Sequence, residues 1–337
     1  MEFFGVSLFG SLSGGAMIAV AALFFIVGLV FIIKGGDWFV DSASWFAEVT
    51  GIPKFVVGAT VVSFATTLPE MLVSIRAAVN GSTQMAIGNA IGSVTANTTL
   101  IMGVSLVAMA GAVNRKSFSV KGILFVASSV AILLLSLSGA LPVWSAAVLW
   151  TFFLIFMFYN IFEGKKEAAL DGPAKFEKGL LGHNILFFIL GTAGIVFGAE
   201  FLVGSGQTLA RSVGISEGII GFTVIALGTS LPELVTTLTA IRKKEASLSV
   251  GNIVGANVID LTLILPLCAA IGGKPLPVER INLMFDFPVC IAASLIAVVP
   301  TMIKGKFKKW QGFALLAIYV AYLVCLVLNE AGVVALG

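Results

Sequence analysis

The chain contains 337 residues, of which 58% are hydrophobic and 11% are charged, and its mean hydropathy is +1.08. Soluble globular proteins carry about 25% charged residues, so this composition excludes an ordinary soluble domain. The 37 glycines suit closely packed transmembrane helices, in which small residues let two backbones approach each other. The composition predicts an all-α polytopic membrane protein.

Apolar runs interrupted by charged residues, Pro or Gly predict ten transmembrane helices. They are expected at residues 15–34 (with room to extend to 49), 53–79, 83–112, 119–138, 142–162, 180–210, 215–241, 246–272, 282–303 and 310–329. A polar segment follows the fifth span. We therefore expect a first five-helix repeat in 1–162, a cytoplasmic linker in 163–179 and a second five-helix repeat in 180–337.

The basic residues predict how these helices are oriented. With the amino terminus outside, 16 of the 20 Lys and Arg residues fall in inner loops, among them Lys34, Lys54 and Lys121, and four fall outside. Positive charge concentrates on the cytoplasmic side of membrane proteins. We therefore expect a multi-pass protein of the plasma (inner) membrane with both termini outside.

A long internal repeat relates the two halves. Residues Gly35–Met102 align without a gap on Gly198–Leu265, at an offset of 163. The motif "ATTLPE" aligns with "GTSLPE", and "IGNAIGSVTANTTLI" aligns with "VGNIVGANVIDLTLI". Because each half holds an odd number of spans, the halves must cross the membrane in opposite directions. Such inverted repeats are typical of secondary transporters, whose sites lie near the bilayer midplane between the repeats.

The motif "SFATTLPE" in the second span gathers oxygen atoms on one helical face. Thr66 and Thr67 lie four and three residues before Glu70, and Ser63 continues this face one turn earlier. Pro69 cannot donate a backbone hydrogen bond to the preceding turn, so one carbonyl there needs another partner. The seventh span repeats the arrangement with the equivalent residues Ala226, Thr229, Ser230 and Glu233.

The third and eighth spans add polar atoms at equivalent positions. Asn97 is equivalent to Asp260, and Ser93 lies one turn before Asn97. An ionised side chain inside a bilayer costs roughly 2.5–3.5 kcal/mol and marks a functional pathway. Shells of oxygen ligands hold hard cations such as Ca²⁺ and Na⁺. The pattern therefore predicts a cation site to which both halves contribute.

These motifs resemble a known family. "ATTLPE" with "GNAIGSVTAN", and "GTSLPE" with "GNIVGANVID", are similar to the two alpha repeats of the sodium/calcium exchanger branch of the calcium/cation antiporters. The resemblance extends through the ten spans over essentially the whole chain. It implies four cation sites between spans 2, 3, 7 and 8, and first and sixth helices that slide across this core. The cation ligands that it implies are Ser63, Thr66, Thr67, Glu70, Ser93, Asn97, Ala226 (through its carbonyl), Thr229, Ser230, Glu233 and Asp260.

The sequence departs from the family pattern at two of these ligand positions and at two other positions of the repeats. Thr67 stands where the first repeat more often has Ser, and Ser63 stands where it has Ala. Val94 replaces an Asn, and Ala256 replaces a Ser that contributes to a Na⁺ site in the family. The last two changes leave the coupling ion open.

The resemblance implies a secondary antiporter that exchanges Na⁺ for Ca²⁺ by alternating access, normally extrudes Ca²⁺, and needs no cofactor. An antiporter coupled to H⁺ on the same scaffold is the alternative, with a Glu or Asp260 as proton carrier. An enzyme is not expected, because the lone His183 lies outside the repeats, and nothing suggests a channel's selectivity ring. The expected partners are the ions and the lipid bilayer, with no nucleic acid and no protein partner. We expect a prokaryotic monomer.

Overall fold

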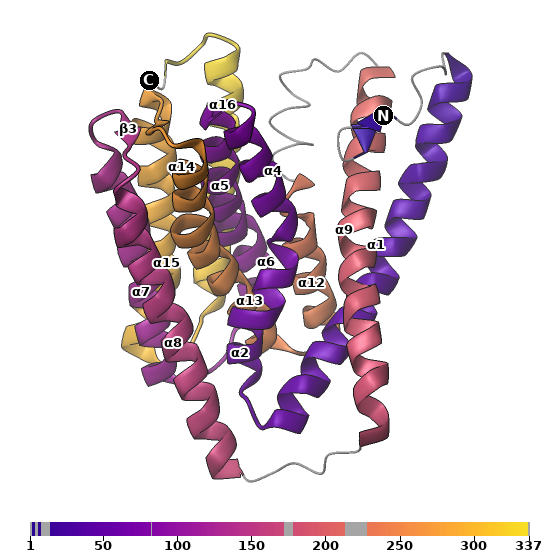
Figure 1. The fold of residues 1–337 in the computed structure, drawn as a ribbon, viewed down its shortest axis with the longest axis vertical. Coiled ribbons are helices and arrows are strands. Elements are labelled where there is room, and N and C mark those ends of the chain that lie inside the picture. Colours follow the sequence, from indigo (N-terminus) through magenta and orange to yellow (C-terminus); the bar gives the residue numbers. More distant parts are fainter. Residues whose placement is uncertain are drawn as a thin grey trace.

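The computed structural model describes residues 2–3, 6–7, 14–81, 83–171, 178–212 and 228–335, and these are almost entirely helical. Helix α1 (Gly15–Thr50) and helix α9 (Lys178–Ser212) lie side by side on one flank, and the other helices form a bundle beside them (Figure 1). With 36 and 35 residues, they are about 54 and about 52 Å long, which exceeds the roughly 30 Å apolar thickness of a bilayer.

Glycine allows α1 and α9 to pack backbone against backbone in opposite directions. A Cβ atom at Gly28 would lie 2.9 Å from the carbonyl oxygen of Gly198, and one at Gly35 would lie 2.9 Å from that of Gly191. Gly28 is the repeat equivalent of Gly191, and Gly35 is that of Gly198. The contact therefore occurs twice, as two-fold symmetry between the halves requires. Larger side chains at these positions would force the helices apart.

The predicted second span is one bent helical path. It consists of α2 (Lys54–Val57), the π-helical turn η1 (Gly58–Val62), α3 (Ser63–Thr66) and α4 (Leu68–Val79). The parts before and after Thr67 differ in direction by 46°. In the second half, α12 (Leu231–Arg242) begins after Ser230, which has φ −86° and ψ 5°, compared with −84° and 1° at Thr67. The break that precedes each Pro-Glu motif is thus the same in both halves.

The elements after each Pro-Glu helix also match one for one. They are α5 (Thr83–Ala96), η2 (Asn97–Ile101) and α6 (Met102–Met109) in the first half, and α13 (Ala246–Ile259), η4 (Asp260–Ile264) and α14 (Leu265–Gly272) in the second. Every boundary is shifted by the 163 residues of the sequence repeat. In the most apolar stretch of these spans, 78% and 83% of the residues are buried, compared with 17% in α1. These two spans are therefore the centre of the bundle.

The remaining elements surround this centre. The helices are α7 (Arg115–Ser136), α8 (Ser145–Asp171), α15 (Phe287–Lys304) with the π-helical turn η5 (Asn282–Asp286) before it, and α16 (Lys309–Glu330). Strand β3 (Ala140–Leu141) pairs antiparallel with β4 (Leu276–Pro277), and β1 (Glu2–Phe3) pairs with β2 (Val6–Ser7). Helix α1 begins and α16 ends at one end of the molecule, whereas α8 ends and α9 begins at the other (Figure 1).

The described residues contain eight helices long and apolar enough to cross a membrane, and the bent path α2–α4 makes a ninth. The predicted seventh span, 215–241, is described only from residue 228 onward. Helix α8 extends nine residues past the predicted end at 162, into the expected linker. Its last residues, "KKEAALD", include strong helix formers, which explains the extension.

Several basic residues expected in inner loops lie in helices instead, and two of them lie well inside long ones. Lys34 is an exposed residue of α1, and Lys121 is a fully buried residue of α7. A helix longer than the bilayer accommodates the first, since its end extends past the lipid. A buried partner accommodates the second, because Glu163 lies 2.5 Å from its ammonium nitrogen.

Candidate cation site

Each Pro-Glu motif places a carboxylate in the first turn of a helix. Pro69 and Glu70 open α4, and Pro232 and Glu233 open α12. Proline suits the first turn because the backbone N–H that it lacks has no partner within the helix there. The positive end of the helix dipole favours the negative charge of each Glu. Both Glu side chains are almost completely buried, with 1% and 0% of their surface exposed.

Three carboxylates approach one another in the centre of the bundle. Glu70 interacts electrostatically with both Glu233 and Asp260. Five of their six oxygens are buried and have no hydrogen-bond partner among the described residues: both from Glu70, both from Asp260 and Oε2 of Glu233. Buried polar atoms are rarely left without partners, and neighbouring carboxylates repel each other. A bound cation would satisfy both requirements.

Hydroxyl groups from both halves lie beside these carboxylates. The Thr67 hydroxyl is 2.6 Å from the backbone oxygen of Ser63 and 3.3 Å from Oε1 of Glu233. Ser93 Oγ lies 3.4 Å from Thr229 Oγ1, and the buried Ser230 hydroxyl has no partner among the described residues. Within the described ranges, no three His, Cys, Asp or Glu side chains could hold a metal alone. A cation shell here must therefore include hydroxyl, amide or carbonyl oxygens.

Asn97 and Asp260 each begin a π-helical turn, η2 and η4. Both polar atoms of the Asn97 side chain are buried and lack a partner among the described residues, like those of Asp260. Single π-helical turns inside α-helices are often found at functional sites. The two turns therefore place an amide and a carboxylate at equivalent points of the centre.

Most of the residues predicted from the sequence reach this buried centre. Those that are buried are Ser63, Thr66, Thr67, Glu70, Ser93, Asn97, Ser230, Glu233 and Asp260. Thr229 is half-buried, and Ala226 lies outside the described residues. Ser63 donates its hydroxyl to the Thr60 carbonyl oxygen at 3.0 Å and lies against Gly255 of α13. Its hydroxyl is therefore engaged within its own helix.

Sequence reasoning missed three asparagines at the centre. Asn252 Oδ1 lies 3.1 Å from the Thr66 hydroxyl, and Asn89 Oδ1 lies 3.2 Å from the Thr229 hydroxyl. Asn257 donates to the Thr98 hydroxyl at 2.9 Å. The sequence repeat could have identified Asn89 and Asn252, because the Asn of "IGNAIG" recurs in "VGNIVG" at the offset of 163 residues.

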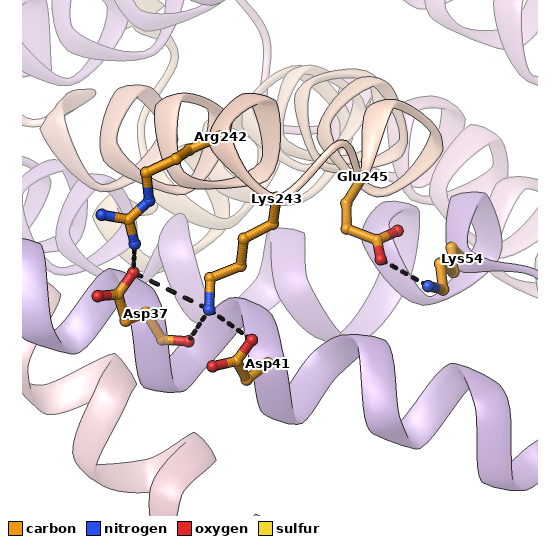
Figure 2. A network of polar contacts seen from close by, with 6 residues as sticks. All are labelled: Asp37, Asp41, Lys54, Arg242, Lys243 and Glu245. Carbon is orange, nitrogen blue, oxygen red and sulfur yellow. Dashed lines mark hydrogen bonds and ion pairs between the residues drawn. The ribbon is translucent and has the colours of Figure 1, made fainter.

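A network of ion pairs, here called the linker-side network, joins α1 to the end of α12 (Figure 2). Its members are Asp37 and Asp41 of α1, Lys54 of α2, Arg242 of α12, and Lys243 and Glu245 in the following loop. Arg242 pairs with Asp37 and Lys243 pairs with Asp41, while Lys54 lies 2.6 Å from Glu245. These contacts lie toward the end of the molecule at which α8 ends and α9 begins (Figure 1).

Comparisons with known proteins agree with this geometry. The sequence model of the family described as "Sodium/calcium exchanger protein" matches residues 20–162 and 183–328. The sodium/calcium exchanger MaX1 of Methanosarcina acetivorans is 31% identical, over 92% of this chain and 99% of its own length. The inner membrane protein YrbG of Escherichia coli is 31% identical, over 82% of this chain and 87% of its own. A solved structure of the sodium-calcium exchanger NCX_Mj, soaked with Na⁺ and Sr²⁺, superposes with a TM-score of 0.80 at 28% identity, covering 91% of this chain and 99% of that one.

Proposed function

Because the chain belongs to the sodium/calcium exchanger family, we propose that it exchanges Na⁺ for Ca²⁺ by alternating access and normally extrudes Ca²⁺. The observation that carries this proposal is the set of five buried carboxylate oxygens that have no hydrogen-bond partner in the part of the chain that the structure describes. They come from both halves of an inverted repeat, and their all-oxygen surroundings suit hard cations.

Glu70 and Glu233 are the central ligands in this proposal and serve both ions. The shell is completed by Ser63, Thr66, Thr67, Ser93, Asn97, Ala226, Thr229, Ser230 and Asp260. Shared carboxylates make the two ions compete for one site. An empty site would carry uncompensated buried charge, which is costly to move across the dry centre of the protein. Exchange, instead of uncoupled leakage, follows from that cost.

Alternating access requires a unit that can move relative to the site. Among the described residues, helices α1 and α9 contact each other far more extensively than either contacts the bundle. Their backbones meet at glycines, and aromatic side chains of the two helices pack against each other, as Phe39 does with Phe188. We therefore assign the movement to the α1–α9 pair and the fixed site to α4, α5, α12 and α13.

The distribution of charge supports an orientation. Of the 20 basic residues, 16 fall on the side expected to be cytoplasmic. We accordingly place the linker between α8 and α9 inside and both termini outside, in the plasma (inner) membrane of a prokaryote. The proposed transport unit is a monomer, because one chain supplies both halves of the site.

Uptake of radiolabelled Ca²⁺ into proteoliposomes tests the function. The vesicles are loaded with Na⁺, and external Na⁺ is replaced by choline. We expect Ca²⁺ uptake that needs internal Na⁺ and stops when the Na⁺ gradient is dissipated. Uptake that ignores internal Na⁺ but follows an imposed pH gradient would instead identify a Ca²⁺/H⁺ antiporter, and no uptake under either gradient would contradict Ca²⁺ transport.

A further inference from the structure

Two hydrogen bonds connect the halves of the protein in the same way. Thr66 of the first half contacts Asn252 of the second at 3.1 Å, and Thr229 of the second half contacts Asn89 of the first at 3.2 Å. Thr66 and Thr229 are repeat equivalents, and so are Asn89 and Asn252. The same contact is thus formed twice, although the side chains come from helices far apart in the sequence.

These contacts differ from the usual behaviour of threonine in a helix. Thr hydroxyls commonly donate to a carbonyl of the preceding turn, as Thr60 does to Val56 at 2.7 Å and Thr67 does to Ser63 at 2.6 Å. The Thr66 hydroxyl is 3.4 Å from the Ser63 carbonyl oxygen, which is farther than its distance to Asn252. The amide oxygen is therefore the better acceptor for its proton.

The destination of that proton decides what the hydroxyl can bind. A hydroxyl has one hydrogen to donate and two lone pairs that accept. When an Asn oxygen on one side takes the hydrogen, the lone pairs point elsewhere and are available to a cation. The next residue, Thr67, has its hydroxyl 3.3 Å from Oε1 of Glu233, so Thr66 lies beside the carboxylate that would hold the cation.

We propose that Asn89 and Asn252 are positioning residues for transport: each accepts the hydroxyl proton of the other half's threonine and turns that oxygen toward the cation. The inference rests on the proposed function, in which Thr66 and Thr229 are cation ligands. It adds two residues that act through those ligands and couple the two halves at the site.

The amide nitrogens of the two asparagines differ in their hydrogen bonds. The Asn89 amide nitrogen also lies 2.9 Å from the Ser74 hydroxyl and 3.3 Å from the Glu70 carbonyl oxygen, which connects α5 to the Pro-Glu helix α4. The buried amide nitrogen of Asn252 has no partner among the described residues. Asn252 therefore isolates the effect on threonine, and Asn89 combines it with support of the Glu70 backbone.

A double-mutant cycle on Asn252 and Thr66 tests the proposal. Asn252→Leu and Thr66→Val should each raise the apparent KM for Ca²⁺ or for Na⁺ roughly three- to tenfold, the equivalent of one hydrogen bond. The double variant should match Thr66→Val alone, because Asn252 acts only through that hydroxyl. Asn252→Gln keeps an amide acceptor oxygen without adding charge and should recover part of the lost affinity.

Asn160→Leu is the matched control, since Asn160 is a buried asparagine of α8 that donates to its own helix at 2.8 Å. Its KM should not change. An unchanged KM in Asn252→Leu, or additive effects in the double variant, would overturn the inference. If Thr66→Val itself leaves both KM values unchanged, the proposed ligand set fails instead. The equivalent cycle on Asn89 and Thr229 serves if Asn252→Leu does not fold.

Discussion

Equivalent residues of the two repeats have different surroundings at the site. Glu233 has a hydroxyl, that of Thr67, 3.3 Å from Oε1, whereas neither oxygen of Glu70 has a hydrogen-bond partner among the described residues. The repeat equivalent of Thr67 is Ser230, and its buried hydroxyl is likewise without a described partner. The two carboxylates therefore differ in the hydrogen-bond donors beside them, although their helices begin in the same way.

Neutralising either carboxylate should stop divalent transport. Glu70→Gln and Glu233→Gln each remove a charge that a buried Ca²⁺ requires, and breaking a buried charge pair costs about 3–5 kcal/mol, which corresponds to at least a roughly 100-fold loss. Initial rates of Ca²⁺ uptake into Na⁺-loaded vesicles measure the effect. Glu279→Gln, which changes an exposed carboxylate, is the control and should transport normally. Full activity in both site variants would refute the proposed ligands.

At the scale of elements, a buried ion pair fastens α7 to α8. The Lys121 ammonium lies 2.5 Å from the Glu163 carboxylate and 3.1 Å from the Ser117 hydroxyl, and it lies over the Phe55 ring at 4.5 Å. Phe55 belongs to α2, so the same ammonium contacts the helical path that leads to Glu70. Such a pair gives the three helices one relative position, because any other position would separate buried charges.

Removing the cation of this pair should destabilise the protein strongly. Lys121→Met leaves Glu163 buried without its charge partner, and we expect a loss of about 3–5 kcal/mol in the free energy of unfolding. Thermal unfolding in detergent measures this loss. Adding Glu163→Gln should restore part of it, because the uncompensated charge disappears. Lys116→Met alters an exposed lysine of the same helix and should have little effect. Equal stability of Lys121→Met and Lys116→Met would show that the pair is not structural.

At the scale of the whole molecule, the linker-side network joins the α1–α9 pair to the bundle. Asp41 and Arg242 are largely exposed, with 65% and 59% of their side-chain surface accessible. Exposed ion pairs contribute only about 0–1 kcal/mol each. The network can therefore hold this end of α1 against α12 without preventing α1 from moving away, as a transporter needs.

Neutralising the acidic side of the network should open this end of the protein more often. In the double variant Asp37→Asn and Asp41→Asn, the pairs to Arg242 and Lys243 are lost. We expect roughly fivefold faster labelling of a cysteine at Ser44, the equivalent of about 1 kcal/mol. Ser44 lines a small cavity beside Asp41 and Lys243. A membrane-impermeant maleimide added on the linker side measures the rate.

Two controls keep this measurement specific. Cys325 is replaced by Ala, because it is the native cysteine that is only partly buried. A cysteine at the exposed Lys166, near the end of α8 and therefore on the linker side, should label at the same rate with and without the two Asn substitutions. Unchanged labelling at Ser44 would mean that the network does not restrain α1.

The sequence alone determined the class of protein and the repeat, and it predicted most of the residues that the structure brings to the buried centre. Hydropathy located the spans because burial in lipid requires a continuous apolar helix. The repeated "LPE" motif pointed to Glu70 and Glu233, and the aligned segments "GSVTAN" and "GANVID" pointed to Asn97 and Asp260, because helix breaks and intramembrane charges depend on local sequence. The element boundaries of the two halves then followed the same offset of 163 residues.

Only the tertiary structure decided which residues meet across the halves. The pairing of Thr66 with Asn252, the burial of Lys121 against Glu163 and the network from Asp37 to Arg242 join residues that are distant along the chain. Such contacts depend on how one helix is rotated and shifted against another. Local periodicity sets the apolar character of a helix, but close packing at glycines and the requirement to satisfy every buried polar atom set its position.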